Sequence, residues 1–230
     1  MNKHLINIKD TGAIGDGITD DSESIQKALD AGCQTVVIPG GNYRIATTLK
    51  VHSDTFLSAD NDAHLFVCGE SPHHRGDFLL TNADPITGNL NITIKGGIWD
   101  GGFGGKYNVK NKDLFDPNAN SGACLNFVGV KNLILTDMVI ANSVTYYMRF
   151  SRIENFVIKN IGFRSEQLSY NQDGLHFGGE VRNGYVENIR ALSDGQTNDD
   201  MIALNADDSI ERLENRDLAR GDIENIYIKD

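Results

Sequence analysis

The chain has 230 residues, of which 40% are hydrophobic and 23% charged, and this composition predicts a globular protein with a substantial core. Its net charge of −11 argues against a nucleic-acid partner, because neutralising phosphates requires clustered Lys and Arg. It contains no run of about 18 apolar residues, so neither a membrane span nor a membrane partner is expected.

The first residues and the cysteines indicate the cellular compartment. The start "MNKHLINIKD" lacks the apolar stretch of a secretory signal and leads directly into a strand pattern. Cys33, Cys68 and Cys124 are odd in number and widely spaced, which fits a reduced compartment or buried small side chains better than a disulfide framework or a metal site. We therefore expect a cytoplasmic location, although a chain from which a signal had been removed would look the same.

The N-terminal segment "DTGAIGDGITDDSESIQKALDAG" predicts one short helix after a Gly-rich turn. Asp20 with Glu23 three residues later is a capping-box arrangement, and Gly32 is expected to end the helix. Its apolar stripe is formed by Ile25, Ala28 and Leu29. The next stretch, "QTVVIPGGNYRI", predicts strand, turn and strand, so residues 1–45 are expected to cap the remainder of the fold.

The rest of the chain contains an internal repeat that begins with Asn. Each unit has Asn, alternating apolar residues, a Gly/Asn/Asp corner and a second short apolar run, which predicts two strands meeting at a polar corner. The units are "NITIKGGIWDG" from Asn91, "NLILTDMVIANS" from Asn132, "NFVIKNIGFRS" from Asn155, "NGYVENIRALSD" from Asn183 and "NIYIKD" from Asn225. Gly184 is an exception to the apolar alternation.

The spacing of these units predicts a solenoid. Their starts are separated by 41, 23, 28 and 42 residues, and no helix-length amphipathic segment lies between them. The short intervals suit one coil, and the long ones suit a coil with an inserted loop or two coils. Asn at the corners fits, because Asn tolerates the left-handed backbone region. We predict an all-β fold, a right-handed single-stranded parallel β-helix with a short N-terminal capping helix, in which residues 1–230 form one domain with coils from about residue 46.

Five segments resemble those of known families. "GAIGDGITDDSESIQKALDA", "VVIPGGNYRI" and "LKVHSDTFLSADNDAHLF" resemble the opening of the pectin-lyase-like β-helix superfamily. "NQDG" (171–174) is similar to the Asn-Thr-Asp-Gly motif of glycoside hydrolase family 28, and "NDDMIAL" (198–204) is similar to the Asp-Asp motif of that family on the next coil. The resemblance covers nearly the whole chain and implies a polygalacturonase-like glycosidase that needs no cofactor or metal.

The resemblance implies three catalytic carboxylates. Asp199 and Asp200 follow Asp173 by 26 and 27 residues, about one coil, so the three should stack on one face of neighbouring coils. Inverting hydrolysis of a glycosidic bond needs one protonated carboxyl and one carboxylate that activates water. By its likeness to the family, Asp199 would be the acid, Asp173 and Asp200 would hold and deprotonate the water, and Asn171 and Asn198 would orient them. Taken alone, both motifs are also ordinary polar turn sequences.

Three further residues are candidates for binding the carbohydrate. His176 follows Asp173 by three residues and can reach the same face, although a packed histidine is the commoner outcome. Arg149 and Arg152 precede "NQDG", and either can hold a uronate carboxylate by bidentate hydrogen bonds or lie on the surface. Trp99 is expected in the core, and the loop from 101 to 120 is expected to wall a cleft.

Two departures from the family pattern concern the C-terminal part. The Gly-His-Gly and Arg-Ile-Lys motifs of the family are absent from residues 209–230. The last strand signature, "NIYIKD", stops where its corner should turn, so either the chain is a fragment or another chain covers this end.

Three functions remain open from the sequence. The first is hydrolysis of a pectic-type polysaccharide or oligosaccharide containing uronate or rhamnose. The second is a lyase that uses Ca²⁺ near Asp173, Asp199 and Asp207. The third is a carbohydrate-binding or tailspike-like β-helix without catalysis, which predicts sugar binding that survives Asp199→Asn.

Overall fold

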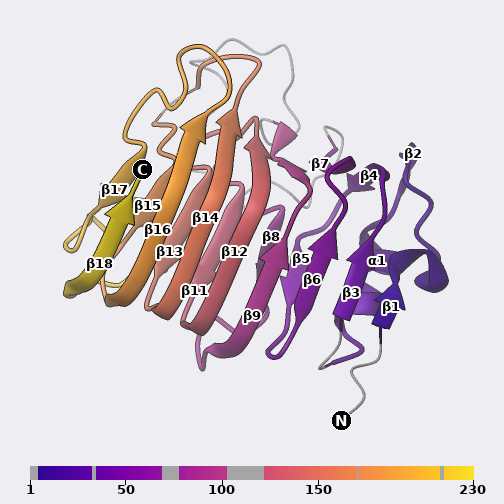
Figure 1. Cartoon of the computed structure of the whole chain (residues 1–230), viewed down its shortest axis with the longest axis horizontal. Coiled ribbons are helices and arrows are strands. Elements are labelled where there is room, and N and C mark those ends of the chain that lie inside the picture. The colour runs from indigo at the N-terminus through magenta and orange to yellow at the C-terminus, as the bar shows by residue number, and fades with distance from the viewer. Residues whose placement is uncertain (1–4, 33–34, 69–77, 103–121, 170, 213–214) are drawn as a thin grey trace.

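The computed structural model describes residues 5–32, 35–68, 78–102, 122–169, 171–212 and 215–230. Within these residues every strand pair is parallel, and the strands stack coil upon coil from the N-terminal end to the C-terminal end (Figure 1). The predicted parallel β-helix with one short N-terminal helix is therefore confirmed. In the described part of the chain, no helix has the length and apolar character needed to cross a membrane.

The strands form two sheets. The 12-stranded sheet contains β1 (Leu5–Asn7), β2 (Asp16–Asp20), β3 (Thr35–Ile38), β4 (Gly41–Ile45), β6 (Phe56–Ala59), β7 (Ala63–Val67), β9 (Asn89–Lys95), β10 (Ile98–Asp100), β12 (Val130–Ala141), β14 (Glu154–Arg164), β16 (Val181–Ala191) and β18 (Ile223–Lys229). The six-stranded sheet contains β5 (Leu49–Val51), β8 (Leu80–Asn82), β11 (Leu125–Val128), β13 (Met148–Ser151), β15 (Leu175–Phe177) and β17 (Ile202–Leu204). A 3-10 helix (Ile8–Thr11) and α1 (Ser22–Leu29) complete the N-terminal end.

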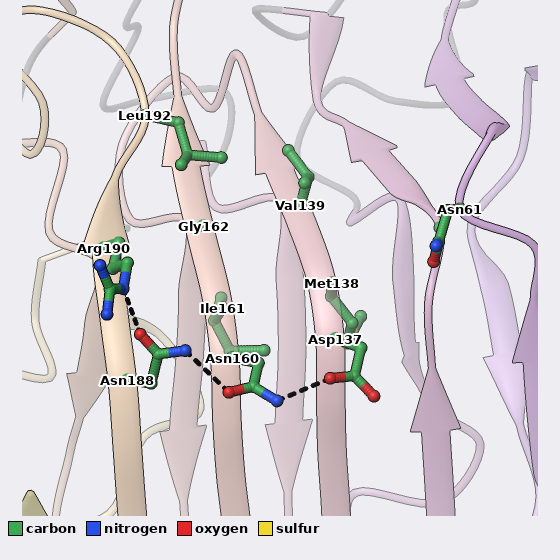
Figure 2. A pocket seen from close by; sticks show the side chains of 11 residues that line it. Asn61, Asp137, Met138, Val139, Asn160, Ile161, Gly162, Asn188, Arg190 and Leu192 are labelled. Atoms are coloured by element: carbon green, nitrogen blue, oxygen red, sulfur yellow. Dashed lines mark hydrogen bonds between the residues drawn. The ribbon is translucent and has the colours of Figure 1, made fainter. Parts of the chain in front are cut away.

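The long strands β12, β14 and β16 each turn a corner, so the 12-stranded sheet covers two faces of the coil. The first half of β12 pairs with β9 and its second half with β10, which are separate strands. Asp137, Asn160 and Asn188 lie at this corner with φ of 59°, 56° and 54°. Hydrogen bonds join Asn160 to Asp137 (2.7 Å) and Asn188 to Asn160 (2.8 Å), as Figure 2 shows across three adjacent strands.

A second row of side chains connects the Asn residues that begin the repeats. Asn91, Asn132, Asn155, Asn183 and Asn225 all have positive φ, between 54° and 61°. Each amide donates to the residue one coil earlier, with N···O distances from 2.7 Å at the Asn91–Asp54 pair to 3.3 Å at the Asn155–Asn132 pair. The expectation that Asn supplies left-handed corners of a stacked repeat is confirmed, since Asn accepts this conformation at low cost.

Apolar side chains stack inside the coils at matching positions. The rings of Phe127, Phe150 and Phe177 lie on successive coils, with centroids 5.9 Å and 4.9 Å apart. Trp99 is fully buried and donates its indole N–H to the Gly96 carbonyl, so its expected core position is confirmed. Cys68 and Cys124 are free and buried, whereas Cys33 and nearly all of the 101–120 loop lie outside the described residues.

The helix α1 lies at the N-terminal end of the stack, where it contacts β5 and the 3-10 helix (Figure 1). Its predicted stripe of Ile25, Ala28 and Leu29 is buried. The predicted capping box of Asp20 and Glu23 is wrong, because the helix begins one residue later with Asp21 as N-cap. The Asp21 carboxylate accepts hydrogen bonds from the N–H groups of Ile14 and Gly15 instead, which fastens the Gly-rich turn to the helix.

Candidate active site

The six-stranded sheet presents a row of polar side chains on its outer face. The strand register places Lys50, Thr81, Asn126, Arg149 and His176 side by side on successive coils. The Asn126 amide donates to the Thr81 hydroxyl (3.0 Å), and the Arg149 Nε donates to Asn126 Oδ1 (2.8 Å). These strands have only three or four residues each, so one outward position per coil defines the row.

The two acidic motifs lie in the turns that lead into β15 and β17, on adjacent coils. The Gly174 N–H donates to the Asp200 carbonyl (2.9 Å) and the Leu175 N–H to the Met201 carbonyl (3.0 Å). The backbone of Asp173 therefore lies beside that of Asp200, as the 26–27 residue spacing predicts. Asp173 is only 4% exposed, whereas Asp199 and Asp200 are exposed.

Amide side chains hold the two turns together. Asn198 accepts from the Gln172 N–H (3.0 Å) and donates to the Ser169 carbonyl (2.5 Å), so it connects neighbouring coils. The fully buried Gln172 donates to the Ser143 carbonyl (2.7 Å) and accepts from the Ser169 N–H and from the Gln196 amide. Asn171 occupies a left-handed corner, with φ of 50°.

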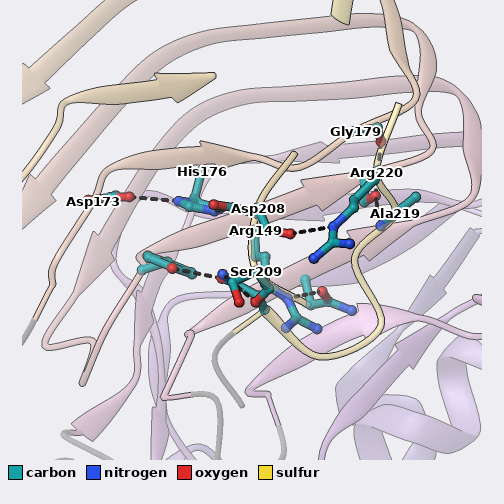
Figure 3. A network of polar contacts seen from close by, with 12 residues as sticks. Arg149, Asp173, His176, Gly179, Asp208, Ser209, Ala219 and Arg220 are labelled. Atoms are coloured by element: carbon teal, nitrogen blue, oxygen red, sulfur yellow. Dashed lines mark hydrogen bonds and ion pairs between the residues drawn. The ribbon is translucent and has the colours of Figure 1, made fainter. Parts of the chain in front are cut away.

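His176 is enclosed between two carboxylates (Figure 3). Its Nδ1 lies 2.7 Å from Asp173 Oδ2 and its Nε2 lies 2.6 Å from Asp208 Oδ2. The Tyr146 ring stacks on the imidazole with a centroid distance of 3.7 Å and an interplanar angle of 11°. The side chain is 1% exposed, so its place in this structure is beside the carboxylates and not in direct contact with a ligand in solvent.

Burial and hydrogen bonding shift the pKa values of this pair. Burial raises the pKa of Asp173, the charges of Asp199 and Asp200 raise it further, and the hydrogen bond from His176 acts in the opposite direction. Burial disfavours a charged His176, but the hydrogen bonds to Asp173 and Asp208 outweigh it, so the pKa of His176 is raised. The His176 imidazole can therefore hold a proton close to the two acidic turns.

Arg149 is the second buried charge of the outer row. It is 1% exposed and its guanidinium lies 4.8 Å from the centroid of the Phe78 ring. Burial lowers its pKa to about 10, and the nearby Asp217 carboxylate opposes this effect. With Lys50, Asn126 and Asp217 it lines a pocket of about 450 Å³.

The structure does not bring Arg152 to Arg149 and His176. Arg152 follows β13 in a left-handed corner (φ 51°), and its guanidinium donates to the Pro85 carbonyl (2.6 Å). It lines a separate hollow of about 320 Å³ with charged side chains of both signs, among them Glu154 and Arg182.

A third surface hollow lies on another face. It has a volume of about 390 Å³ and lies over the Asp137–Asn160–Asn188 corner, with Met138 and Ile161 among its apolar lining (Figure 2). None of the predicted catalytic residues lines it.

Among the residues that the structure describes, no group of three or more His, Cys, Asp or Glu side chains is arranged to hold a metal ion. Asp207, the third residue of the Ca²⁺ alternative, lies after β17 and outside any such group.

Sequence reasoning missed three residues of this site. Asp208 belongs to neither of the two matched motifs, yet it binds His176 from 32 residues away. Tyr146 lies in an aromatic-rich stretch of sequence that does not distinguish it from its neighbours. Its role depends on the contact of its ring with His176 on the next coil. Gln172 is the second residue of "NQDG", and nothing in that motif marks its side chain as buried.

Stacked parallel coils with acidic turns on neighbouring coils place the protein in the pectin-lyase-like class of β-helices. The family described as "Rhamnogalacturonase A/epimerase, pectate lyase-like" matches residues 5–211, so the chain belongs to that family.

The relatives include proteins named as enzymes and proteins named as phage appendages. A polygalacturonase of Persea americana is 26% identical over 215 residues, 86% of this chain and 43% of the relative. The pre-neck appendage protein of Bacillus phage B103 is 33% identical over 96 residues, 42% of this chain and 11% of the relative. The chain thus spans less than half the length of both curated relatives. The structure of a Yersinia enterocolitica family 28 exopolygalacturonase shares the fold with a TM-score of 0.74 at 19% identity, covering 99% of this chain and 48% of the other.

Proposed function

We propose that the protein is a glycoside hydrolase that cleaves a pectic-type polysaccharide or oligosaccharide, containing uronate or rhamnose, with inversion. The observation that carries the proposal is the position of the buried Asp173 beside Asp200, on neighbouring coils of a polygalacturonase-like β-helix. Acidic side chains brought together in this way supply the acid and the base that the reaction needs.

The environments of the carboxylates support different roles. Burial raises the pKa of Asp173 and the hydrogen bond from His176 opposes this rise, and a raised pKa makes the ionised carboxylate a stronger general base. Asp199 is exposed at the rim, where it can meet a leaving oxygen, and we assign it as the general acid. Asp200, in register with Asp173, would hold the water with it.

The pocket along the outer row supports an anionic substrate. Arg149 and Lys50 contribute two positive charges and Asp217 one negative charge to the lining of this pocket, on a chain whose net charge is −11. Lys50 is exposed and can pair with a uronate carboxylate, while the buried Arg149 adds positive charge to the pocket lining. We propose that this pocket accommodates a sugar next to the cleaved bond, while Asn171, Asn198 and His176 maintain the turns.

The test is the release of reducing sugar from a panel of pectic oligosaccharides. Asp173→Asn, Asp199→Asn and Asp200→Asn should each lower kcat by about 10²- to 10⁴-fold, the usual contribution of a positioned acid or base. Asp194→Asn, which changes an acid in the turn before this site, is the matched control and should retain full activity. Absence of release by the folded parent chain from every substrate would contradict the proposal.

A second candidate is carbohydrate binding without turnover. It is favoured by the burial of Asp173 and His176 and by the likeness to a phage appendage protein. In this case oligosaccharides would bind the parent and Asp199→Asn with equal affinity in calorimetry, and no product would form from either.

A further inference from the structure

The segment between β17 and β18 lies against the outside of the six-stranded sheet. We call residues 205–212 and 215–222 the outer segment. The Ala219 N–H donates to the Ser151 hydroxyl (2.8 Å), and the Ala219 carbonyl accepts from the Gly179 N–H (2.8 Å). Leu218 packs closely against Gly178, where even a Cβ would lie 3.1 Å from the Leu218 side chain. These contacts fix the outer segment over β13 and β15.

The outer segment places Asp208 at Nε2 of His176, on the opposite edge of the ring from Asp173. Asp173 belongs to the turn before β15 and Asp208 to the outer segment, so one imidazole joins two parts of the chain 35 residues apart. Carboxylates only accept hydrogen bonds, and both ring nitrogens donate only in the imidazolium form. When both carboxyl groups are ionised, the two short contacts are therefore satisfied by a charged His176.

Tyr146 sets the plane of the ring. It stacks face to face on His176, and its hydroxyl donates to Asn215 Oδ1 (2.8 Å) in the outer segment. Rotation of the imidazole about its side-chain bonds would break the stack and both carboxylate contacts together. The ring is thereby fixed in one orientation by groups from three parts of the chain.

We propose that Asp208 and Tyr146 are positioning residues for the reaction, which fix His176 so that its Nδ1–H holds one oxygen of Asp173 and leaves the other oxygen to act on water. This inference rests on the proposed function and deepens it, because it explains how the carboxylate of a buried base is held in one orientation. It also assigns a role to the outer segment, which carries neither of the two matched motifs.

Asp173 and Asp208 are the charged groups that raise the pKa of His176, and other charged groups lie around them. Asp173 precedes it on the same coil, Asp208 faces it from the outer segment, and Arg149 lies beside it on β13. Asp199 and Asp200 raise the pKa of Asp173, and Asp217 raises that of Arg149. Removing the charge of Asp208 is the change that leaves the other groups in place.

The test compares Asp208→Asn with Asp207→Asn in the full chain. Asn at 208 keeps an oxygen that can accept from Nε2 but removes the charge, whereas Asp207 is the adjacent acid in the same turn. The pKa of His176, followed by NMR and assigned with His176→Gln, should be above the ordinary histidine value in the parent and fall in Asp208→Asn only. The basic limb of the pH profile of kcat should move to lower pH in the same variant, and kcat at its optimum should fall about 10- to 100-fold.

A titration of His176 at or below the ordinary histidine value in the parent would overturn the inference without any variant. An unchanged pH profile in a folded Asp208→Asn would do the same. If Asp208→Asn does not fold, Tyr146→Phe removes only the hydroxyl that binds Asn215, and it should lower kcat with little change in KM. The NMR titration needs no substrate, so failure of the inference is distinguishable from failure of the hydrolase proposal, which shows as no turnover by the parent.

Discussion

The ring of Phe156 fills the space that a side chain at Gly184 would occupy on the next coil. The two residues are in register on β14 and β16, and Phe156 also packs against Phe177, with ring centroids 5.6 Å apart. The exception to the apolar repeat at Gly184 is therefore a packing feature, in which a large residue on one coil is matched by a missing side chain on the next.

Gly184→Ala should destabilise the protein, because the new methyl group overlaps the Phe156 ring. Overpacking of a core usually costs about 1–3 kcal/mol in the free energy of unfolding, measured here by urea denaturation. Adding Phe156→Leu to Gly184→Ala should recover part of the loss. Equal stability of Gly184→Ala and the parent would show that the coils can shift to make room.

Asn155→Ala should destabilise the protein for two separable reasons. Ala at φ 57° incurs about 1–2 kcal/mol of backbone strain, and the hydrogen bonds to Asn132 and Asn183 are lost. Asn155→Gly removes the same hydrogen bonds without the strain. The difference between the two variants in thermal unfolding measures the conformational part, and a larger loss for Gly than for Ala would contradict this account.

The stability of the fold should depend on pH through His176. Because the folded-state pKa of His176 is raised, its contribution is complete below the ordinary value of about 6.5 and is lost as the pH rises through the raised value. The pKa of Asp173 is also raised, so ionisation of Asp173 likewise lowers the stability of the fold as the pH rises. This loss begins at a lower pH, near the ordinary pKa of aspartate. The melting temperature of the parent should therefore fall above pH 6.5 by more than that of His176→Gln, and parallel curves would contradict the prediction.

Gln172→Ala should affect both stability and activity. It leaves the Ser143 carbonyl, the Ser169 N–H and the Gln196 amide without this buried partner, at about 1–3 kcal/mol for each group left unsatisfied. Since Gln172 also precedes Asp173, the turn should shift and kcat should fall. Urea denaturation and the reducing-sugar assay measure the two effects, and a fully stable variant with unchanged kcat would show that solvent replaces the amide.

The sequence was sufficient to predict the coils because each corner repeats the same chemistry. Asn132 and Asn155 mark their corners with a residue that accepts positive φ, and the apolar residues between them alternate with period two. The six-stranded sheet was harder to predict, because strands such as β15 have three residues and carry too little alternation to define a face.

The site could be predicted only where its residues belong to short motifs. Asp173 and Asp200 were placed on neighbouring coils from their spacing, and the structure has them there. The separation of Arg152 from Arg149 depends on where β13 ends, which the sequence does not mark. The contact between Asp208 and His176 depends on the path of the outer segment, for which no repeat or pattern provides a guide.

The row of Asn side chains has a consequence for how such a protein can change its length. Each corner amide donates to the coil before it and accepts from the coil after it, so neighbouring corners present identical donors and acceptors. A coil inserted between Asn132 and Asn155 with its own corner Asn would find both partners already in place. Gain or loss of whole coils would thus preserve the hydrogen bonding of this corner, whereas insertion of part of a coil would shift every later residue out of its row.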